Sequence, residues 1–263
     1  MAIKFILLSL ALPLCLHATF MKELTCEGDG TFSQSELYDA LGLKQPAWYE
    51  FWKDKHPKIN AKLTSTLRES LQNYYKSEGF YHAHVEKIED IQSILFKVTK
   101  GAPTIIKDIN SSLEDRYDEL ITYAIGDRFN ANTFISIKKE IKNRLLEDGY
   151  CNNNFDAKAR IDIEKNIVHI YYTLQKNSPC KFGKITINTP DNVDDIIIAS
   201  RLHFTEGSTY SSKLIRDSYS TISGLEAFDG VQLSQKRESD VIHLNIDLKK
   251  KIKTYTTRDW YWI

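Results

Sequence analysis

The sequence predicts an α+β chain built from three tandem copies of one β-α-α-β-β module, and three observations lead to this prediction. A helix-like segment ends three times at a turn that carries a glycine and then an aromatic residue, which is Phe80, Tyr150 or Phe228. Two short runs with the alternation of half-buried strands follow each turn. A further strand-like run precedes each helical region, so the same order of elements recurs along the chain.

The first 18 residues are predicted to be a cleaved secretory leader. Lys4 is followed by an apolar run over 5–16, which is too short to span a bilayer, and the segment ends in Leu-His-Ala. The mature chain is therefore expected to begin near Thr19, outside the cytoplasm. Lipid attachment at Cys15 is disfavoured because the bulky Leu14 precedes it.

The first copy is predicted over 19–102. Its first helix begins at Ser33, which forms a capping-box pattern with Glu36, and its long helix ends at Gly79, where a left-handed residue is needed. The segment 44–60 between the two helices is expected to be an irregular, partly buried insertion. The predicted strands of this copy are 21–26, 83–88 and 93–98, and its predicted first helix is 33–41.

The second copy is predicted over 103–180 and the third over 181–253, with a tail at 254–263. Gly149 ends the long helix of the second copy as Gly79 does in the first, whereas Gly224 stands earlier in its turn and fits less closely. In the second copy the predicted strands are 103–109, 157–163 and 167–174, and the predicted first helix is 113–124. In the third copy the predicted strands are 183–187, 230–235 and 241–248, and the predicted first helix is 193–202.

The long helices share a pattern of apolar residues that predicts one buried face. Counting back from the aromatic residue of each turn, the same two places are occupied by large apolar side chains in every copy. Because these places are four residues apart, they lie on one face of a helix. The residues are Leu67 and Leu71, Ile137 and Ile141, and Ile215 and Tyr219.

The charge balance excludes partners that bind through a strong electrostatic field. The chain has 35 basic and 35 acidic residues and a formal net charge of zero. It therefore has no basic footprint for nucleic acid, and no basic run suited to an anionic membrane. No catalytic or cofactor-binding motif such as a P-loop, a G-x-S-x-G nucleophile elbow or H-E-x-x-H is present, and no cofactor is expected.

The repeated module resembles the POTRA (polypeptide-transport-associated) domain. The resemblance is carried by the turn at 77–85, by the loop at 126–130, and by the segment at 204–219. A Gly-x-x-Tyr or Gly-x-x-Phe before a helix is common in POTRA modules, and the last two segments contain one each. The residues are Gly126 with Phe129 and Gly207 with Tyr210, and a structural role in shaping and anchoring the loop is favoured for them. Three modules in series behind a leader resemble most the TamA family of the translocation and assembly module.

This resemblance implies a periplasmic arm of an outer-membrane assembly factor, in a Gram-negative bacterium. It implies unfolded outer-membrane proteins as clients and a partner subunit anchored in the inner membrane, with the first copy toward that partner. In the family a membrane β-barrel follows the last module, and membrane contact is expected only if such a barrel exists. The chain is not expected to be an enzyme.

The expected binding sites are the strands that directly follow each turn, at 83–88, 157–163 and 230–234. An uncovered strand edge accepts an incoming strand through main-chain hydrogen bonds, which suits clients that are still unfolded. That these strands lie at an edge comes from the family resemblance. The candidate residues are Ala83, His84, Val85, Glu86, Ala157, Lys158, Ala159, Arg160, Val231, Gln232 and Leu233.

Two alternatives stay open at the level of sequence. One is a POTRA protein of the main barrel-assembly complex, of two-partner secretion or of cell division. The other is a periplasmic metal-dependent hydrolase that uses His82 and His84 and needs a third ligand from elsewhere in the chain; His82, His84 and Glu86 alternate and would share one face of a strand. A solvated polar face is the simpler interpretation of these three residues, and no metal site is predicted.

A disulfide between Cys151 and Cys180 is predicted from strand register. A two-residue turn at Lys165 and Asn166 pairs residues whose numbers sum to 331, and the two cysteines have this sum. Directly opposed antiparallel residues come near the spacing of a disulfide. Two unpaired thiols remain the alternative, because a bulge shifts the register. Cys26 is expected to be a small core residue.

Overall fold

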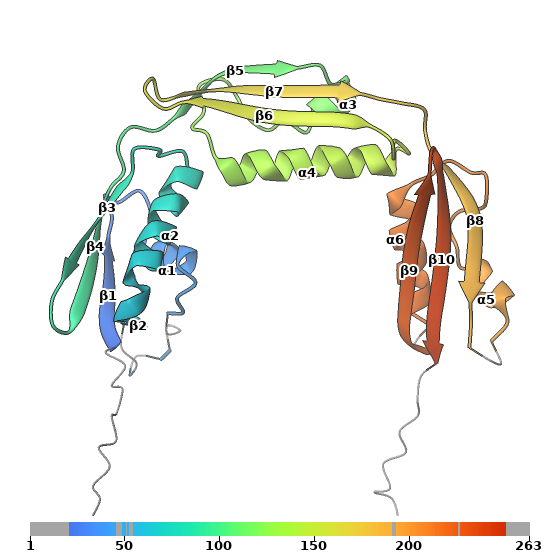
Figure 1. Cartoon of the computed structure of the whole chain (residues 1–263), viewed down its shortest axis with the longest axis horizontal. Coiled ribbons are helices and arrows are strands. Elements are labelled where there is room, and N and C mark those ends of the chain that lie inside the picture. The colour runs from blue at the N-terminus through green and yellow to red at the C-terminus, as the bar shows by residue number, and fades with distance from the viewer. Residues whose placement is uncertain are drawn as a thin grey trace, which may run out of the picture. The chain divides into compact units, whose positions relative to one another are not determined.

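The computed structural model describes residues 21–45, 49, 50, 52, 55–190, 193–225 and 227–250 (Figure 1). The chain divides into two compact units, Met1–Pro103 and Thr104–Ile263. The three predicted copies are called modules 1, 2 and 3 below, so that unit 1 holds module 1 and unit 2 holds modules 2 and 3. The predicted leader at 1–18 and tail at 254–263 lie outside the described residues. Among the described helices, none is both long enough and apolar enough to cross a bilayer.

Module 1 contains a four-stranded sheet in the order β2-β1-β4-β3. The predicted capping box is present, since the backbone N–H of Ser33 donates to Glu36 (2.7 Å) and that of Glu36 donates to Ser33 Oγ (3.3 Å). Three strands were expected and four are present, because the end of the predicted irregular insertion forms the additional strand β2 and pairs with β1. The elements are β1 (Met21–Glu27), α1 (Gln34–Ala40), β2 (Lys58–Asn60), η1 (Ala61–Leu63), α2 (Thr64–Ser77), β3 (His84–Glu89) and β4 (Ser93–Thr99).

Module 2 contains a three-stranded sheet in the order β5-β7-β6. The helix predicted over 113–124 is wrong in length, because α3 is a single turn. That turn buries Tyr117, and Tyr123 then leaves the helical path to donate from its hydroxyl to the carbonyl of Asn130 at 2.8 Å. The elements are β5 (Ile105–Ser111), α3 (Asp115–Asp118), α4 (Ala131–Glu147), β6 (Asn154–Asp162) and β7 (Ile167–Gln175).

Module 3 contains a three-stranded sheet in the order β8-β10-β9. The helix predicted over 193–202 is shorter than expected, and the Asp194 side chain caps it by accepting from the N–H of Ile196 at 3.0 Å. The strand predicted at 230–235 is longer than expected and includes Phe228. The elements are β8 (Lys181–Asn188), α5 (Asp195–Ala199), α6 (Ser212–Ser223), β9 (Phe228–Glu238) and β10 (Val241–Lys250).

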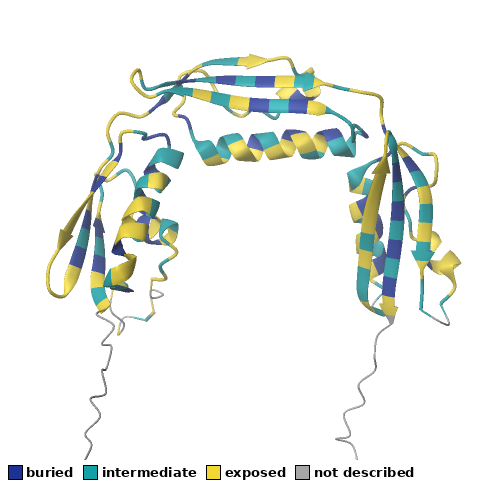
Figure 2. Cartoon of the chain, in the orientation of Figure 1, coloured by how far each residue is buried: buried dark blue, intermediate teal, exposed yellow. Residues whose placement is uncertain are grey.

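All three sheets follow one topology. The first strand of each module lies parallel to the last, and the last pairs antiparallel with the strand before it. The last strand, β4, β7 or β10, is therefore flanked on both sides. In Figure 2 buried residues alternate with less buried ones along β7 and β10, as expected for a sheet covered on one face by helices.

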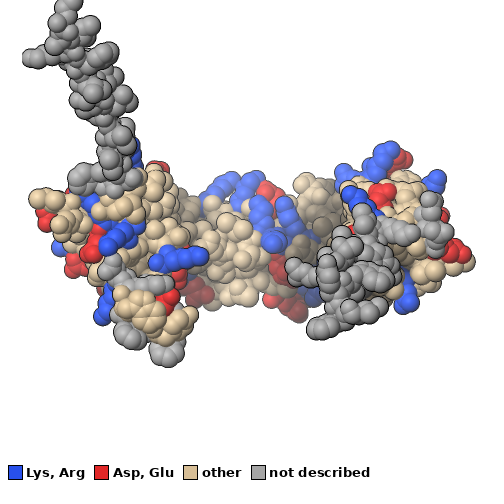
Figure 3. Space-filling model, turned by 90° about the horizontal axis from the view of Figure 1, so that it is seen from below, with Lys and Arg blue, Asp and Glu red and all other residues tan. Residues whose placement is uncertain are grey.

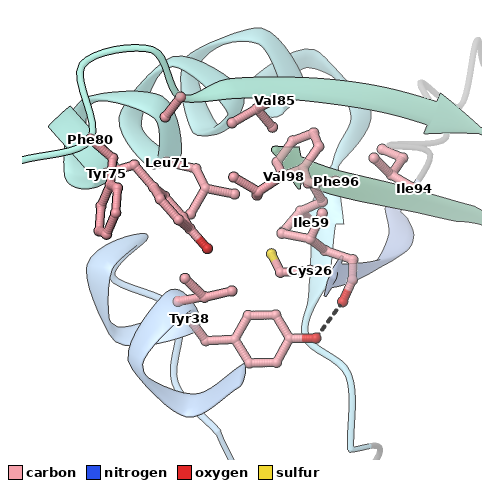
Figure 4. Packing of buried hydrophobic residues seen from close by; sticks show 13 residues of the cluster. Cys26, Tyr38, Ile59, Leu71, Tyr75, Phe80, Val85, Ile94, Phe96 and Val98 are labelled. Atoms are coloured by element: carbon pink, nitrogen blue, oxygen red, sulfur yellow. Dashed lines mark hydrogen bonds between the residues drawn. The ribbon is translucent and has the colours of Figure 1, made fainter. Parts of the chain in front are cut away.

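The core of module 1 shows how one layer of helices closes such a sheet. Leu71 and Tyr75 of α2 pack over Phe96 of β4, and all three are fully buried (Figure 4). Tyr38 of α1 donates its hydroxyl to the carbonyl of Leu24 at 2.9 Å, which satisfies this buried polar group. Cys26 lies inside this core, and burial raises the pKa of its thiol to about 12.

The buried face of the long helix is predicted correctly in modules 1 and 2, and in module 3 the prediction is correct for Ile215 and wrong for Tyr219. Leu71 and Ile141 are fully buried, but Tyr219 is 46% exposed. Ser218 and Ile222 take the buried places instead. The shift is consistent with the turn, because Gly79 and Gly149 have the left-handed φ values of 87° and 94°, whereas Gly224 stays helical at −70°.

The predicted hairpin register in module 2 is also wrong. Asp162 pairs with Ile167 and Asn154 with Gln175, so paired numbers sum to 329 rather than 331. The turn has four residues instead of two, and Asn166 supplies its positive φ of 54°. The side chain of Asp162 accepts from the N–H of Lys165 at 3.0 Å and stabilises this longer turn.

Candidate functional site

The glycine loops of modules 2 and 3 cover the outer side of the first strand. Gly126 donates its N–H to the Ile106 carbonyl (2.9 Å), and Phe129 donates to that of Thr104 (2.9 Å). In module 3 the same two bonds recur, because Gly207 donates to Phe182 (2.7 Å) and Tyr210 to Cys180 (2.8 Å). Both glycines have positive φ, at 96° and 79°, and both aromatic side chains are buried. The two patterns therefore shape and anchor a loop that occupies one edge of each sheet.

Module 1 covers the same edge in another way. β2 pairs antiparallel with β1, and the N–H of Leu24 donates to the carbonyl of Pro57 at 2.9 Å. In all three modules the first strand is thus flanked on its outer side. The sequence did not predict that the outer edge of the first strand is covered, because the covering segments have no strand pattern of their own.

The opposite edge of each sheet is formed by β3, β6 and β9. Each of these strands pairs with only one neighbour in the described part of the chain (Figure 1). They are the strands that the sequence analysis selected. A free edge presents a row of backbone N–H and C=O groups that can pair with another strand.

The direction of these backbone groups follows from the hydrogen bonds on the covered side. The carbonyl of Tyr172 accepts from the N–H of Ser112, so the groups of Tyr172 point toward β5. Its partner Ala157 then points its own N–H and C=O away from β7, because both groups of a strand residue lie on the same side. The carbonyls of Gln92 and Asp240, which accept from Glu23 and Lys181, orient β4 and β10 in the same way.

Alternation along the registers then identifies the residues whose backbone groups face outward. They are Val85, Lys87 and Glu89 on β3, Phe155, Ala157, Ala159 and Ile161 on β6, and Val231, Leu233, Gln235 and Arg237 on β9.

This orientation divides the predicted candidate residues into two groups. Val85, Ala157, Ala159, Val231 and Leu233 present outward backbone groups. His84, Glu86, Lys158, Arg160 and Gln232 lie on the same strands, but their backbone groups face the neighbouring strand. Ala83 precedes β3 and lies buried in the turn, where its N–H donates to the carbonyl of Phe80 at 3.1 Å.

The two faces beside β9 differ in character. Val231 and Leu233 pack against the apolar clusters under α6. On the other face Ser234, Lys236 and Glu238 line a hollow of about 370 Å³ together with residues of β8 and β10. A strand added beside β9 thus meets apolar side chains on one face and polar side chains on the other.

The far end of β3 is held by two ion pairs. Glu89 accepts from Lys22 at 2.7 Å and from Lys87 at 2.6 Å. These two ammonium groups lower the pKa of the Glu89 carboxyl to about 2. The ion pair with Lys22 ties this edge strand to β1.

The proposed metal ligands do not share a strand face. β3 begins at His84, so His82 lies in the turn before the strand rather than in alternation with His84 and Glu86. Within the described ranges, no group of three His, Cys, Asp or Glu side chains is placed to hold a metal ion. The geometry that the hydrolase hypothesis requires is absent from this part of the chain.

Modules 2 and 3 are joined at a junction built around the two cysteines. Cys151 and Cys180 form a disulfide with a Cα–Cα distance of 5.8 Å. They do not oppose each other in the hairpin, because the numbers of paired residues there sum to 329 and those of the two cysteines sum to 331. They meet because the chain bends back after β7, where the N–H of Cys180 donates to the carbonyl of Gly149 at 2.8 Å.

Side chains from both modules reinforce this junction. Arg237 of β9 donates to the carbonyl of Cys151 at 3.0 Å, and Arg216 of α6 forms an ion pair with Glu147 of α4. Leu146 and Cys151 pack against the apolar cluster of module 3. Covalent, polar and apolar contacts thus coincide at one short segment.

Charged residues of both signs are interspersed on the face of the molecule shown in Figure 3. Such a face has no extended field of one sign with which to attract a partner. Recognition there depends on local contacts and backbone hydrogen bonds.

Comparison with known proteins identifies the fold. No protein-family model and no curated protein matches the sequence. The structure is similar to POTRA domains 3–5 of BamA from Haemophilus influenzae, with a TM-score of 0.57 and 16% identity over 90% of this chain and 100% of that chain. It is also similar to BamA from Haemophilus ducreyi lacking POTRA domains 1–3 (TM-score 0.46, 18% identity, 54% of this chain and 28% of that one). POTRA domains 1–3 of Omp85 from Anabaena match with a TM-score of 0.33 and 11% identity, over 88% of this chain and 95% of that one.

Of these three, the first is close enough to identify the fold. The chain is an α+β protein with three small mixed sheets and their helices, which match three POTRA modules. The particular resemblance to TamA remains a prediction.

Proposed function

We propose that this chain is the periplasmic POTRA arm of an outer-membrane protein assembly or translocation factor, and that it binds unfolded clients or partner subunits by strand addition. The observation that carries the proposal is the asymmetry of the sheets. In all three modules one edge is covered by a loop or a short strand, and the other presents outward backbone groups. Strand addition reads the backbone of the added chain and therefore suits clients of varied sequence.

The more specific role is that of a TamA-like factor at the outer membrane of a Gram-negative bacterium. In this role module 1 contacts a subunit anchored in the inner membrane, and module 3 lies toward the outer membrane. The ordered series of three modules supports this role. The alternative is an arm of the main barrel-assembly complex or of two-partner secretion, and it is supported by the structural likeness to the BamA fragment.

Photo-cross-linking tests the proposal on the full chain. A photo-reactive residue replaces Gln232 on the open edge strand β9, and in a matched control it replaces Lys107 on the covered strand β5. Both positions are exposed. The probe is an outer-membrane β-barrel protein diluted from urea. We expect cross-links from position 232 and few from position 107, whereas equal yields from both would contradict binding at the open edges.

A second variant tests the hydrogen bonds themselves. Gln235→Pro removes one outward N–H of β9 and leaves the ladder to β10 intact, which an edge strand tolerates. We expect the cross-link yield at position 232 to fall while the circular dichroism spectrum stays unchanged. A full yield from the folded variant would show that the client binds by side chains instead.

The same cross-linkers, placed on module 1 in living cells, separate the specific role from its alternative. A TamA-like arm is expected to capture an inner-membrane protein from module 1. Recovery of outer-membrane or periplasmic proteins alone would favour the main barrel-assembly complex or two-partner secretion.

A further inference from the structure

One contact at the open edge of module 2 involves Lys138 of α4. Its ammonium group donates to the backbone carbonyl of Ala157 on β6 at 3.1 Å. Ala157 faces the helix side of the sheet and is 4% exposed, so its small side chain leaves room for the lysine to reach across to the strand. The contact joins a helix residue to the backbone of the edge strand.

The carbonyl that Lys138 holds is one of the outward groups of the edge. Tyr172, the partner of Ala157, has its own carbonyl engaged by Ser112 on the β5 side. The Ala157 carbonyl therefore points away from β7, toward the place that an added strand would occupy. The ammonium group occupies part of the approach to this carbonyl, so an incoming strand has to compete with it for the hydrogen bond and for the space beside β6.

Two residues of α6 can be matched with Lys138, and only one of them is basic. Counted from the aromatic residue of the turn the match is Arg216, and counted from the buried residue that follows, the match is Ile215. Lys138 stands three residues before the buried Ile141, and Ile215 stands three residues before the buried Ser218. Ile215 is 7% exposed and belongs to the apolar cluster against which Leu233 of β9 packs.

The basic residues of α6 are engaged elsewhere. Lys213 pairs with Asp217 at 2.7 Å, and Arg216 pairs with Glu147 at the module junction. Neither is in place to hold a carbonyl of β9. In α2 the position that corresponds to Lys138 is Arg68, which stands three residues before the buried Leu71 and is exposed.

We propose that Lys138 closes the β6 edge to strand addition, so that unfolded clients dock on β9 and not on module 2. This inference rests on the proposed function, and it assigns the docking to particular modules. Lysine at a strand edge commonly prevents unwanted pairing, and here the side chain comes from the covering helix rather than from the strand. Module 2 then acts as a spacer, and α4 determines this through one side chain.

Hydrogen exchange of the outward amides tests the proposal. The probe is a ten-residue synthetic peptide of alternating Val and Thr, added to the full-length wild type and to Lys138→Met. Residue-resolved rates are read at Phe155, Ala157, Ala159 and Ile161 on β6 and at Val231, Leu233, Gln235 and Arg237 on β9. A protected amide is expected to exchange about fivefold more slowly or better, the factor that one net hydrogen bond provides.

In the wild type we expect the peptide to protect β9 and leave β6 unprotected, and in Lys138→Met we expect it to protect both. Lys139→Met removes the same charge from the neighbouring exposed position and is expected to behave as the wild type. Lys138→Arg keeps a cation and is expected to leave β6 closed. Unchanged exchange at β7 in all variants without peptide shows that module 2 is folded.

The remaining outcomes refute one idea or the other. Protection of β6 in the wild type, or protection of β9 alone in Lys138→Met, overturns the role of Lys138 and leaves strand addition at β9 standing. Protection of neither edge in any variant refutes the proposed strand addition, and the role of Lys138 falls with it.

Discussion

Reduction of the Cys151–Cys180 disulfide is expected to loosen unit 2 and leave unit 1 unchanged. The bond closes a loop with a sequence separation of 29, which contains the whole β6–β7 hairpin. In the chain-entropy model such a closure removes about 12 cal/mol/K from the unfolded chain, or about 3.6 kcal/mol of stability at 25 °C. Amides that exchange through global opening of module 2 should then exchange about 400-fold faster after reduction, since each 1.36 kcal/mol is a factor of ten.

Residue-resolved hydrogen exchange measures this in one sample. The amides of β7 report on module 2, and those of β4 in unit 1 serve as the internal control. Cys180 is fully buried, so reduction is carried out in mild denaturant before the protein is returned to buffer. The double variant Cys151→Ala with Cys180→Ala is expected to show fast β7 exchange with and without reductant. Equal β7 rates in the oxidised and reduced wild type would refute the reasoning.

Three further predictions concern the turns and the core. Gly149→Ala is expected to lower the free energy of unfolding, measured with a chemical denaturant, by about 2–3 kcal/mol, because φ is 94° and the new Cβ would lie 2.9 Å from the Tyr210 carbonyl oxygen. Gly207 has open space around it and a φ of 79°, so Gly207→Ala should lower the free energy of unfolding by only about 1 kcal/mol. Cys26 should resist iodoacetamide at pH 8 until unit 1 unfolds, since burial raises the pKa of its thiol from 9.0 to about 12, and labelling of the native protein would contradict this. The stability that the neutral thiol contributes is complete below pH 9 and is lost as the pH rises toward 12. Leu71→Ala, at a fully buried position, should cost about 2–5 kcal/mol in the transition of unit 1 and leave that of unit 2 in place, and a shift of both would show that the units unfold together.

The repeated architecture could be predicted from the sequence because it depends on local physics. A glycine with positive φ ends the helix at Gly79 and at Gly149, and alternating apolar residues define the strands. These signals lie within about fifteen residues of chain, so they are readable without the fold. The same local signals selected β3, β6 and β9, although their place at the edges came from the family resemblance.

Tertiary structure decided the features that depend on distant contacts. The hairpin of module 2 has a four-residue turn, so Cys151 and Cys180 meet through the bend after β7 and not through the register that first paired them. Tyr219 is exposed because the buried face of α6 runs from Ile215 through Ser218 and Ile222. The reach of Lys138 to Ala157 spans a helix and a strand, and no periodicity within either segment encodes it. Periodicity states which face of an element is apolar, but only packing decides what a long polar side chain at the border of that face can reach.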